Sequence, residues 1–458
     1  MPYPSMTDTI AAISTPYGTG GIAVIRISGR DAIAIADTLY RGSAPLCGAA
    51  SYTVHYGTLW ADGELLDEVL VSLFRAPRTY TREDVVEIGC HGGIYCANRV
   101  LEAVLSAGAR LAEPGEFTKR AYLNGRVDLA EAEAVMSLIS AKTPRGCRAA
   151  LNQMQGHLSR RIDAVRTDLI ALDAHVQVLC DYPDEGLEPL SDAEFTEKLS
   201  GCQHALESLL AAAQRGKLVR EGIDTIIAGR PNVGKSSLLN LLCGTDRAIV
   251  TDIAGTTRDT LEESVTLGGI VLKLTDTAGL RDTDEAVEAI GVQKARDLLS
   301  QAALILYLVD GSAPQCTEDT EILSTLPPER TVLLRNKSDK GAQLEKDAFS
   351  AFPHQIPFSA KTGQGLDELE LLITRLFLEN GDRLQDDDAV LLGVRAKTAL
   401  EAALSSVRDA RQGMADGFSP DTAALDIEAA IAHLGAVDGK SVGEEVVDAM
   451  FHQFCVGK

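Results

Sequence analysis

One segment constrains this chain more than any other: Gly229–Ser236 matches the phosphate-loop pattern G-x-x-x-x-G-K-S. The apolar run at 225–228 predicts a buried strand before the loop, and residues 237–242 predict a helix after it. In that setting the loop amides and the helix N-terminus surround a phosphate. Lys235 is then expected to reach the β- and γ-phosphates, and Ser236 to offer its hydroxyl to Mg²⁺. The expected nucleotide contacts here are Asn232, Val233, Gly234, Lys235, Ser236 and Ser237.

Four further signals follow this loop in the order found in nucleotide-dependent switch domains. Residues 252–259 include a threonine pair suited to sensing the γ-phosphate, and Asp276–Gly279 ends a predicted hairpin that turns at 268–269. Asn336–Asp339 follows one apolar strand, and Ser359–Lys361 follows another. The nucleotide contacts predicted in these segments are Thr251, Asp252, Ile253, Ala254, Gly255, Thr256, Thr257, Asp276, Thr277, Ala278, Gly279, Asn336, Lys337, Ser338, Asp339, Ser359, Ala360 and Lys361.

The chemistry of Asp339 predicts that the base is guanine. Guanine presents an N–H and an NH₂ on one edge, and a carboxylate accepts hydrogen bonds from both. Adenine would place an acceptor against that carboxylate, which costs on the order of 1–3 kcal/mol. Asn336 and the Ala360 amide suit the other edge of the base, and the Lys337 stem can lie over the ring. The sequence therefore predicts a GTP-binding domain with GTP and Mg²⁺ as ligands.

Composition limits the remaining possibilities. The net charge of −23 argues against broad, nonspecific nucleic-acid binding. Nine cysteines without a C-x-x-C pair indicate reduced thiols, a cytoplasmic location and no structural zinc. We also expect no membrane association, because the longest apolar run, at 302–309, is far too short to span a bilayer. The first five residues lack the basic start of a secretory leader.

The chain is too long for one core, so several domains are expected. Residues 1–125 combine strand alternation with helical spacing, which predicts an α/β domain. Residues 126–218 and 381–458 show helical patterns, including a long one at 144–180, and predict one discontinuous helical bundle. Residues 219–380 form a P-loop (Ras-like) G domain inserted into it. The fold class is therefore multidomain, α/β plus all-α.

At this point the chain resembles the MnmE (TrmE) family of bacterial tRNA uridine-modification GTPases. The resemblance runs along essentially the whole chain. Its marks are the segments at 18–29, 87–93, 114–121 and 123–126, the inserted G domain, and the terminus Phe454–Lys458.

The resemblance implies an activity that the G domain alone does not. Members act with a flavoprotein, MnmG (GidA), in a heterotetramer, and add a carboxymethylaminomethyl or aminomethyl group to carbon 5 of wobble uridine in certain tRNAs. The one-carbon unit comes from 5-formyltetrahydrofolate or a related tetrahydrofolate bound by the N-terminal domain, while GTP hydrolysis drives domain rearrangement. Members form homodimers through these N-terminal domains. The folate-binding positions match Arg26, Glu87, Arg126 and Lys458.

The resemblance also assigns roles in GTP hydrolysis. Leu280 stands where many GTPases carry a glutamine, and the catalytic glutamate of the family matches Glu288, which on spacing alone is one solvated acid among several. Catalysis is then expected from Glu288, Lys235 and Asn232. Asn232 can ligate K⁺, with further oxygens from Thr251, Ile253 and Thr256, and Ser236 and Thr257 would hold Mg²⁺. Arg258 is an alternative source of positive charge.

Three alternatives stay open at the sequence level. A ribosome-assembly RNA-binding GTPase would need a basic module beside the G domain, which the acidic C-terminal helices do not favour. A folate-dependent methyl- or aminomethyltransferase regulated by GTP overlaps with the main interpretation, and a pure scaffolding GTPase is the third possibility. Cys455 is either a reactive thiol near the folate or an inert buried one.

Overall fold

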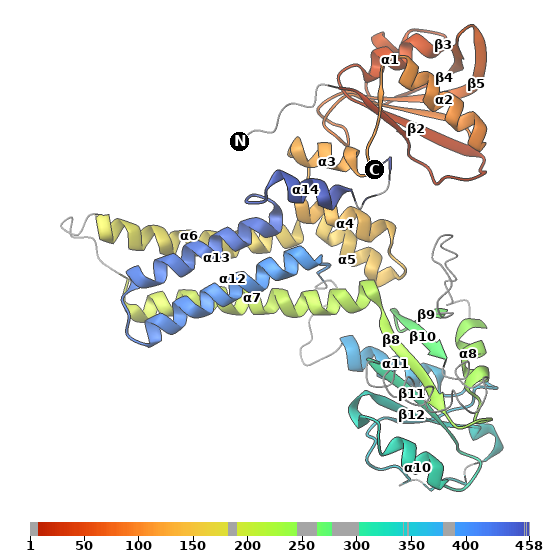
Figure 1. The fold of residues 1–458 in the computed structure, drawn as a ribbon, viewed down its shortest axis with the longest axis vertical. Helices are drawn as coiled ribbons and strands as arrows, with labels where there is room; N and C mark the ends of the chain where they lie inside the picture. The colour runs from red at the N-terminus through yellow and green to blue at the C-terminus, as the bar shows by residue number, and fades with distance from the viewer. Residues whose placement is uncertain are drawn as a thin grey trace, which may run out of the picture. The chain divides into compact units, whose positions relative to one another are not determined.

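The computed structural model describes residues 8–181, 190–244, 263–276, 302–341, 343–345, 348–378, 390–452, 454 and 456–457 (Figure 1). The chain divides into two compact units. The first comprises Met1–Met136, Met154–Leu206 and Gly393–Lys458, and the second comprises Ser137–Gln153 and Glu207–Leu392. The domain limits proposed from the sequence stay predictions.

A seven-stranded sheet dominates the N-terminal part of the first unit, in the order β3-β4-β5-β6-β2-β1-β7. Its strands are β1 (Ile10–Ile13), β2 (Ile22–Ser28), β3 (Tyr40–Gly42), β4 (Thr53–Ala61), β5 (Glu64–Phe74), β6 (Val85–His91) and β7 (Arg110–Leu111). Alternate residues of β5 and β6 pack into a core with α1 (Ala32–Leu39) and α2 (Ile94–Ser106), because neighbouring strand residues point to opposite faces. The predicted α/β character of this region is confirmed.

The face of β4 and β5 that points away from this core carries exposed apolar side chains. Tyr56 of β4 lies directly opposite Leu70 of β5, and the two are 64% and 52% exposed. Val54 of β4, and Tyr52 just before this strand, are similarly exposed. A contiguous apolar strip of this kind is unusual on an isolated domain and is typical of a protein contact surface.

The rest of the first unit is helical. It contains α3 (Glu116–Leu123), α6 (His157–Asp181), α12 (Val394–Ala415), α13 (Pro420–Asp438) and α14 (Glu444–Phe451). Helix α13 packs against both α12 and α6 (Figure 1). The buried residues of α6 recur every three or four positions, which gives one apolar face: Leu158, Ile162, Val165, Leu169, Leu172 and Val176. Helices α4 (Leu129–Ile139) and α7 (Asp192–Glu221) have residues in both units.

The long helix predicted at 144–180 is interrupted. The structure has α5 (Pro144–Met154) and then α6, with Gln155 and Gly156 between them. Gly156 has a φ of 74°, a left-handed conformation that glycine adopts without steric cost and that ends a right-handed helix. The apolar spacing continues across the break, so the periodicity alone could not reveal it.

The second unit is built on a six-stranded sheet in the order β13-β12-β11-β8-β10-β9. The strands are β8 (Ile223–Gly229), β9 (Glu263–Leu267), β10 (Ile270–Asp276), β11 (Leu304–Asp310), β12 (Thr331–Asn336) and β13 (Gln355–Pro357). All pairs are parallel except β9 with β10, which turn at Gly268-Gly269 as predicted. Helices α8 (Lys235–Gly244) and α11 (Leu366–Leu378) pack in one core with the sheet, and α10 (Thr317–Leu323) packs in another.

This arrangement brings together those predicted nucleotide motifs that the structure describes. Because the carboxyl ends of parallel strands share one edge of a sheet, the segments that follow β8, β11, β12 and β13 meet there. Within the described ranges, helices long and apolar enough to cross a membrane are absent.

Candidate functional site

The phosphate loop connects β8 to α8 in the second unit. Asn232 and Gly234 adopt φ values of 61° and 108°, so the loop folds tightly and its amides can converge on one point. The Lys235 ammonium donates to the carbonyl oxygens of Gly229 and Arg230, each at 2.8 Å. Asn232, Ser236 and Ser237 are exposed, while Val233 is buried beneath the loop. The residues predicted for phosphate binding therefore face solvent on a loop anchored from below.

A buried carboxylate holds the loop from the side. Asp319 of α10 accepts a hydrogen bond from Arg230 Nε at 2.9 Å and another from the Tyr307 hydroxyl at 3.1 Å. Tyr307 and Asp319 are almost completely buried, and the Arg230 side chain is 24% exposed. Burial and the neighbouring Asp319 raise the pKa of Tyr307, which keeps its hydroxyl protonated as a donor. This contact could not be predicted from the sequence, because the three residues lie on separate elements.

Asn336 joins two loops of the site. Its side-chain nitrogen donates to the Val233 carbonyl at 2.6 Å, and its side-chain oxygen accepts from the Ala360 amide at 2.9 Å. Asn336 is buried, with 3% of its surface exposed. The Asn336 side chain and the Ala360 amide thus bond to each other, and their contact with the base stays a prediction. The pair fixes the loop after β13 against the phosphate loop.

The loop after β12 presents the predicted base-binding residues. Asp339 is exposed and accepts from the Ser359 hydroxyl at 2.8 Å, a bond that lowers the pKa of Asp339. Lys337 has a φ of 64° and donates to Asp310 at 2.6 Å. Burial acts to raise the pKa of Asp310, but the bonds from Lys337 and Ser312 outweigh it and hold the pKa below its usual value. An ionised Asp339 at an open edge is suited to accept two donors from a guanine base.

Several predicted residues lie outside the described part of the chain. These are Thr251, Asp252, Ile253, Ala254, Gly255, Thr256, Thr257, Thr277, Ala278, Gly279, Glu288, Cys455 and Lys458. Strand β10 ends at Asp276, opposite Ile227 of β8, so the backbone of Asp276 lies beside the phosphate-loop strand, while its side chain is also outside the description. The backbone N–H of Ser338 donates a hydrogen bond to the Phe358 carbonyl, and Lys361 is exposed.

A second candidate site lies in the first unit, in a cavity of about 510 Å³. That volume is within the range that accommodates a small-molecule ligand. The cavity is lined by Tyr52, Phe74, Pro77, Arg78, Thr79, Tyr80, Arg82, Val85, Glu87 and Arg126. Two of the predicted folate contacts, Glu87 and Arg126, thus line one cavity although 39 positions separate them in the numbering.

Three of the four predicted folate residues gather around Tyr80. Arg26 pairs with Glu87 through two bonds of 2.8 and 2.9 Å, both to Oε1, which leaves Oε2 to other donors. The guanidinium carbons of Arg126 and Arg26 lie 4.7 and 5.8 Å from the Tyr80 ring centroid. Arg26 also donates to the Gly457 carbonyl at 3.3 Å, so the C-terminal segment reaches this site. Tyr80 was missed in the sequence, where it is one tyrosine in an irregular segment.

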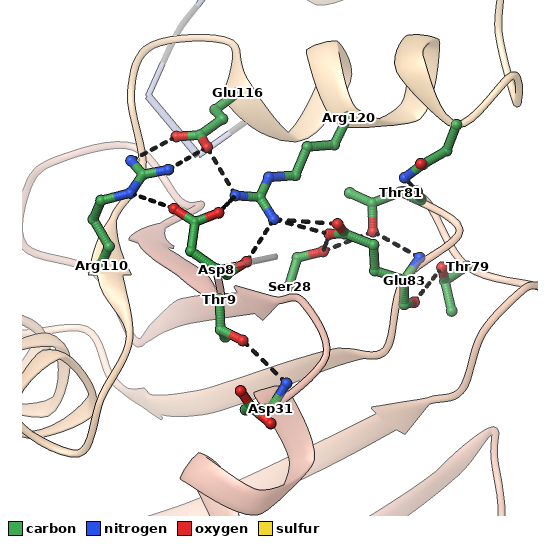
Figure 2. Close-up of polar contacts among 11 residues, drawn as sticks. Asp8, Thr9, Ser28, Asp31, Thr79, Thr81, Glu83, Arg110, Glu116 and Arg120 are labelled. Carbon is green, nitrogen blue, oxygen red and sulfur yellow. Dashed lines mark hydrogen bonds and ion pairs between the residues drawn. The ribbon is translucent and has the colours of Figure 1, made fainter. Parts of the chain in front are cut away.

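A buried ion-pair network joins two arginines and three carboxylates of the same unit (Figure 2). Arg120 of α3 is 1% exposed and bonds to Asp8, Glu83 and Glu116 at 2.7, 3.2 and 3.0 Å. Arg110 adds bonds to Asp8 and Glu116 at 2.8 and 2.6 Å. The network connects α3 to the strands of the sheet. Arg126 follows α3 closely, and its amide donates to the Ala121 carbonyl of that helix at 2.8 Å.

Comparisons with known proteins agree along the whole chain. Residues 9–126 match a family model described as the GTP-binding protein TrmE N-terminus, and residues 129–455 match one described as the MnmE helical domain. The tRNA modification GTPase MnmE of Acetivibrio thermocellus is 43% identical over 98% of this chain and 99% of its own length. The MnmE proteins of Lactococcus lactis and Levilactobacillus brevis are each 44% identical over 98% of this chain and 98% of theirs.

Two of the similar solved structures each cover part of the chain. Aquifex aeolicus Era is 27% identical, covers 40% of this chain and 66% of its own, and has a TM-score of 0.28. The G domain of the T. maritima FeoB iron transporter is 28% identical, covers 34% of this chain and 98% of its own, and has a TM-score of 0.26.

Proposed function

The chain belongs to the MnmE family of tRNA modification GTPases, and from this membership we propose that it modifies the wobble uridine of certain tRNAs at carbon 5. The group added is an aminomethyl or carboxymethylaminomethyl group, and the partner enzyme is a flavoprotein of the MnmG (GidA) type. GTP hydrolysis is the activity that the family establishes. This membership favours tRNA modification over ribosome assembly.

The nucleotide site would use its residues as follows. Lys235 moves from the carbonyls of Gly229 and Arg230 to the β- and γ-phosphates when GTP binds, and so stabilises the charge that develops during hydrolysis. Ser236, with Thr257, holds Mg²⁺. Asp339 selects guanine through its exposed carboxylate. Glu288 orients the attacking water through a second water.

A potassium ion would supply further positive charge beside the negatively charged phosphates. Asn232 supports this proposal, because it is exposed on the phosphate loop, where it adopts a φ of 61°. Its side-chain oxygen would ligate K⁺ together with oxygens of Thr251, Ile253 and Thr256. Oxygen ligands suit a hard cation of this kind.

The cavity at Glu87 would bind the tetrahydrofolate that donates the one-carbon unit. The Glu87 carboxylate can accept from the N–H and NH₂ of a pterin edge, in the same way that Asp339 would accept from guanine, and its Oε2 takes no part in the bonds from Arg26. Arg126 and Lys458 are suited to the glutamate tail, because guanidinium and ammonium groups bind carboxylates strongly. The observation that carries this proposal is the convergence of Arg26, Glu87 and Arg126 around Tyr80, beside Gly457.

Two copies of the chain would pair through their N-terminal sheets. The exposed strip of Tyr56 and Leu70 supports this, because it presents apolar surface on the face away from the core. Leu70→Glu would place a charge in that contact, and sedimentation should then show a monomer. A Leu371→Glu variant, at an exposed leucine of the second unit, is the matched control and should leave the dimer intact.

The proposed function is tested by measuring wobble-uridine modification in cells that lack the gene. The wild-type chain should restore the modified nucleoside, and Lys235→Ala should not. Arg126→Ala should lower both tetrahydrofolate binding and modification while GTP turnover stays normal. Arg99→Ala serves as the control, since Arg99 pairs with Glu64 on the surface of the same domain. Full modification with Arg126→Ala would refute the role given to the cavity.

A further inference from the structure

Three side chains with metal-binding atoms converge where β6 turns into α2. Asp67 lies on β5, Cys90 near the end of β6, and Cys96 in the first turn of α2. One carboxylate oxygen and the two sulfur atoms all lie within 4.8 Å of one another. Cys90 points into the core between the sheet and α2, whereas Glu87 of the same strand lines the cavity described above. The cluster is therefore separate from both candidate sites.

The carboxylate of Asp67 is already oriented by its neighbours. Its Oδ2 accepts from the His91 amide at 2.8 Å and from the Cys96 thiol at 3.2 Å. Its Oδ1 bonds His91 Nδ1 at 2.6 Å. Asp67 is only 9% exposed, while the His91 ring is 72% exposed. A carboxylate held in this way loses little further freedom when it binds an ion.

Although the cysteine spacing led us to expect no structural zinc, we propose that Asp67, Cys90 and Cys96 bind one zinc ion. Two thiolates and a carboxylate are a donor set typical of zinc, whereas Ca²⁺ and Mg²⁺ prefer sites built of oxygen atoms alone. Two sulfur atoms that each lie about 2.3 Å from a tetrahedral zinc are about 3.8 Å apart, which the observed separation accommodates. Binding replaces the protons of two thiols, so one Zn²⁺ enters as two protons leave to solvent.

The proposed zinc site would have three protein ligands and one supporting residue. Three protein ligands leave one tetrahedral position for water or a small exogenous ligand. His91 acts as a positioning residue, because its imidazole holds Asp67 Oδ1 and so directs Oδ2 toward Cys96. The ion would join β5, β6 and the start of α2, and would thus fix the helix that covers the sheet.

The test uses the full chain, reduced with a phosphine and free of nucleotide, in excess Mg²⁺. Zinc should bind at one equivalent per chain, and cobalt in its place should give a thiolate-to-metal absorption band. Asp67→Asn, Cys90→Ser and Cys96→Ser should each weaken binding about 100-fold or more and abolish the band. His91→Ala should weaken it by about 10- to 100-fold, as expected for a group that supports a ligand.

Cys47→Ser is the matched control. Cys47 is exposed in the same domain and also lies beside a carboxylate, Asp37, but its substitution should leave zinc binding unchanged. Because Cys90 is buried, its substitution could also impair folding. The thermal midpoint of each variant without zinc, compared with that of the wild type, separates lost zinc binding from lost folding. Asp67→Asn is the mildest of the three changes, because it keeps the shape of the side chain. Zinc stoichiometry that persists in all three ligand variants, or cobalt binding without the thiolate band, would overturn the proposal.

Discussion

Replacing Asp319 by alanine tests whether the phosphate loop depends on the buried carboxylate beside it. Asp319 accepts hydrogen bonds from Arg230 Nε at 2.9 Å and from the Tyr307 hydroxyl at 3.1 Å. Arg230 in turn provides one of the two carbonyls that hold Lys235. The substitution would remove the anchor without touching any residue proposed to contact GTP.

The expected loss of stability can be worked out from the burial of each partner. Tyr307 is completely buried, so its unpaired hydroxyl costs about 1–3 kcal/mol. Arg230 is partly exposed and can turn to solvent, so it adds only about 1 kcal/mol. The total is about 2–4 kcal/mol, which corresponds to a thermal midpoint lower by about 5–12 °C for a unit of this size.

The substitution should also lower GTP affinity, because the phosphate loop would lose its anchor. If the anchor contributes about 1–2 kcal/mol to the conformation that binds nucleotide, GTP affinity falls by about 5- to 30-fold. A double-mutant cycle measures this effect. It compares the wild type with Asp319→Ala, Arg230→Ala and the double variant, by fluorescent-GTP titration and by thermal unfolding. The two single effects should not add, with a coupling of about 0.5–3 kcal/mol. A GTP affinity within twofold of wild type, despite lower stability, would refute the reasoning.

Two further predictions concern charged groups. Burial acts to raise the pKa of Glu116, but hydrogen bonds from Arg110, the Glu113 amide and Arg120 outweigh it and lower that pKa from 4.5. The folding stability that these bonds contribute is therefore complete above about pH 4.5. It is lost as the pH falls through the lowered pKa. Acid unfolding followed by circular dichroism should be less steep in Glu116→Gln, and an unchanged acid limb would contradict this. Asp339→Asn should weaken GTP binding about 10- to 100-fold and favour xanthosine triphosphate, whose 2-oxo group accepts from the new amide; unchanged base preference in competition titrations would contradict it.

Motifs that are continuous in sequence predicted the strands, the turn and the helix of the second unit well. The loop at 229–236 and the strands before 336 and 359 lie where the apolar pattern placed them. Such predictions succeed because each motif carries its own strand, turn and helix signals over a few residues. The glycine pair at 268–269 worked for the same reason, since a left-handed turn requires that residue type.

Contacts between distant elements could not be predicted in this way. Nothing local marks Asp319 as the partner of Arg230, and Tyr80 stands in a segment without periodicity. The cluster of Cys90 and Cys96 lacks a familiar metal-binding spacing, and its third member, Asp67, comes from a neighbouring strand. The break at Gly156 was missed because apolar spacing continues on both sides of it. Each of these features depends on tertiary packing.

GTP turnover in potassium against sodium buffer, with wild type and Asn232→Ala side by side, tests the central claim most directly. Potassium should strongly stimulate turnover by the wild type and should not stimulate the variant, because the asparagine oxygen would hold the cation beside the phosphates. Equal turnover in the two salts would contradict the account and would shift the stabilising charge to Arg258 or to an arginine of a partner protein.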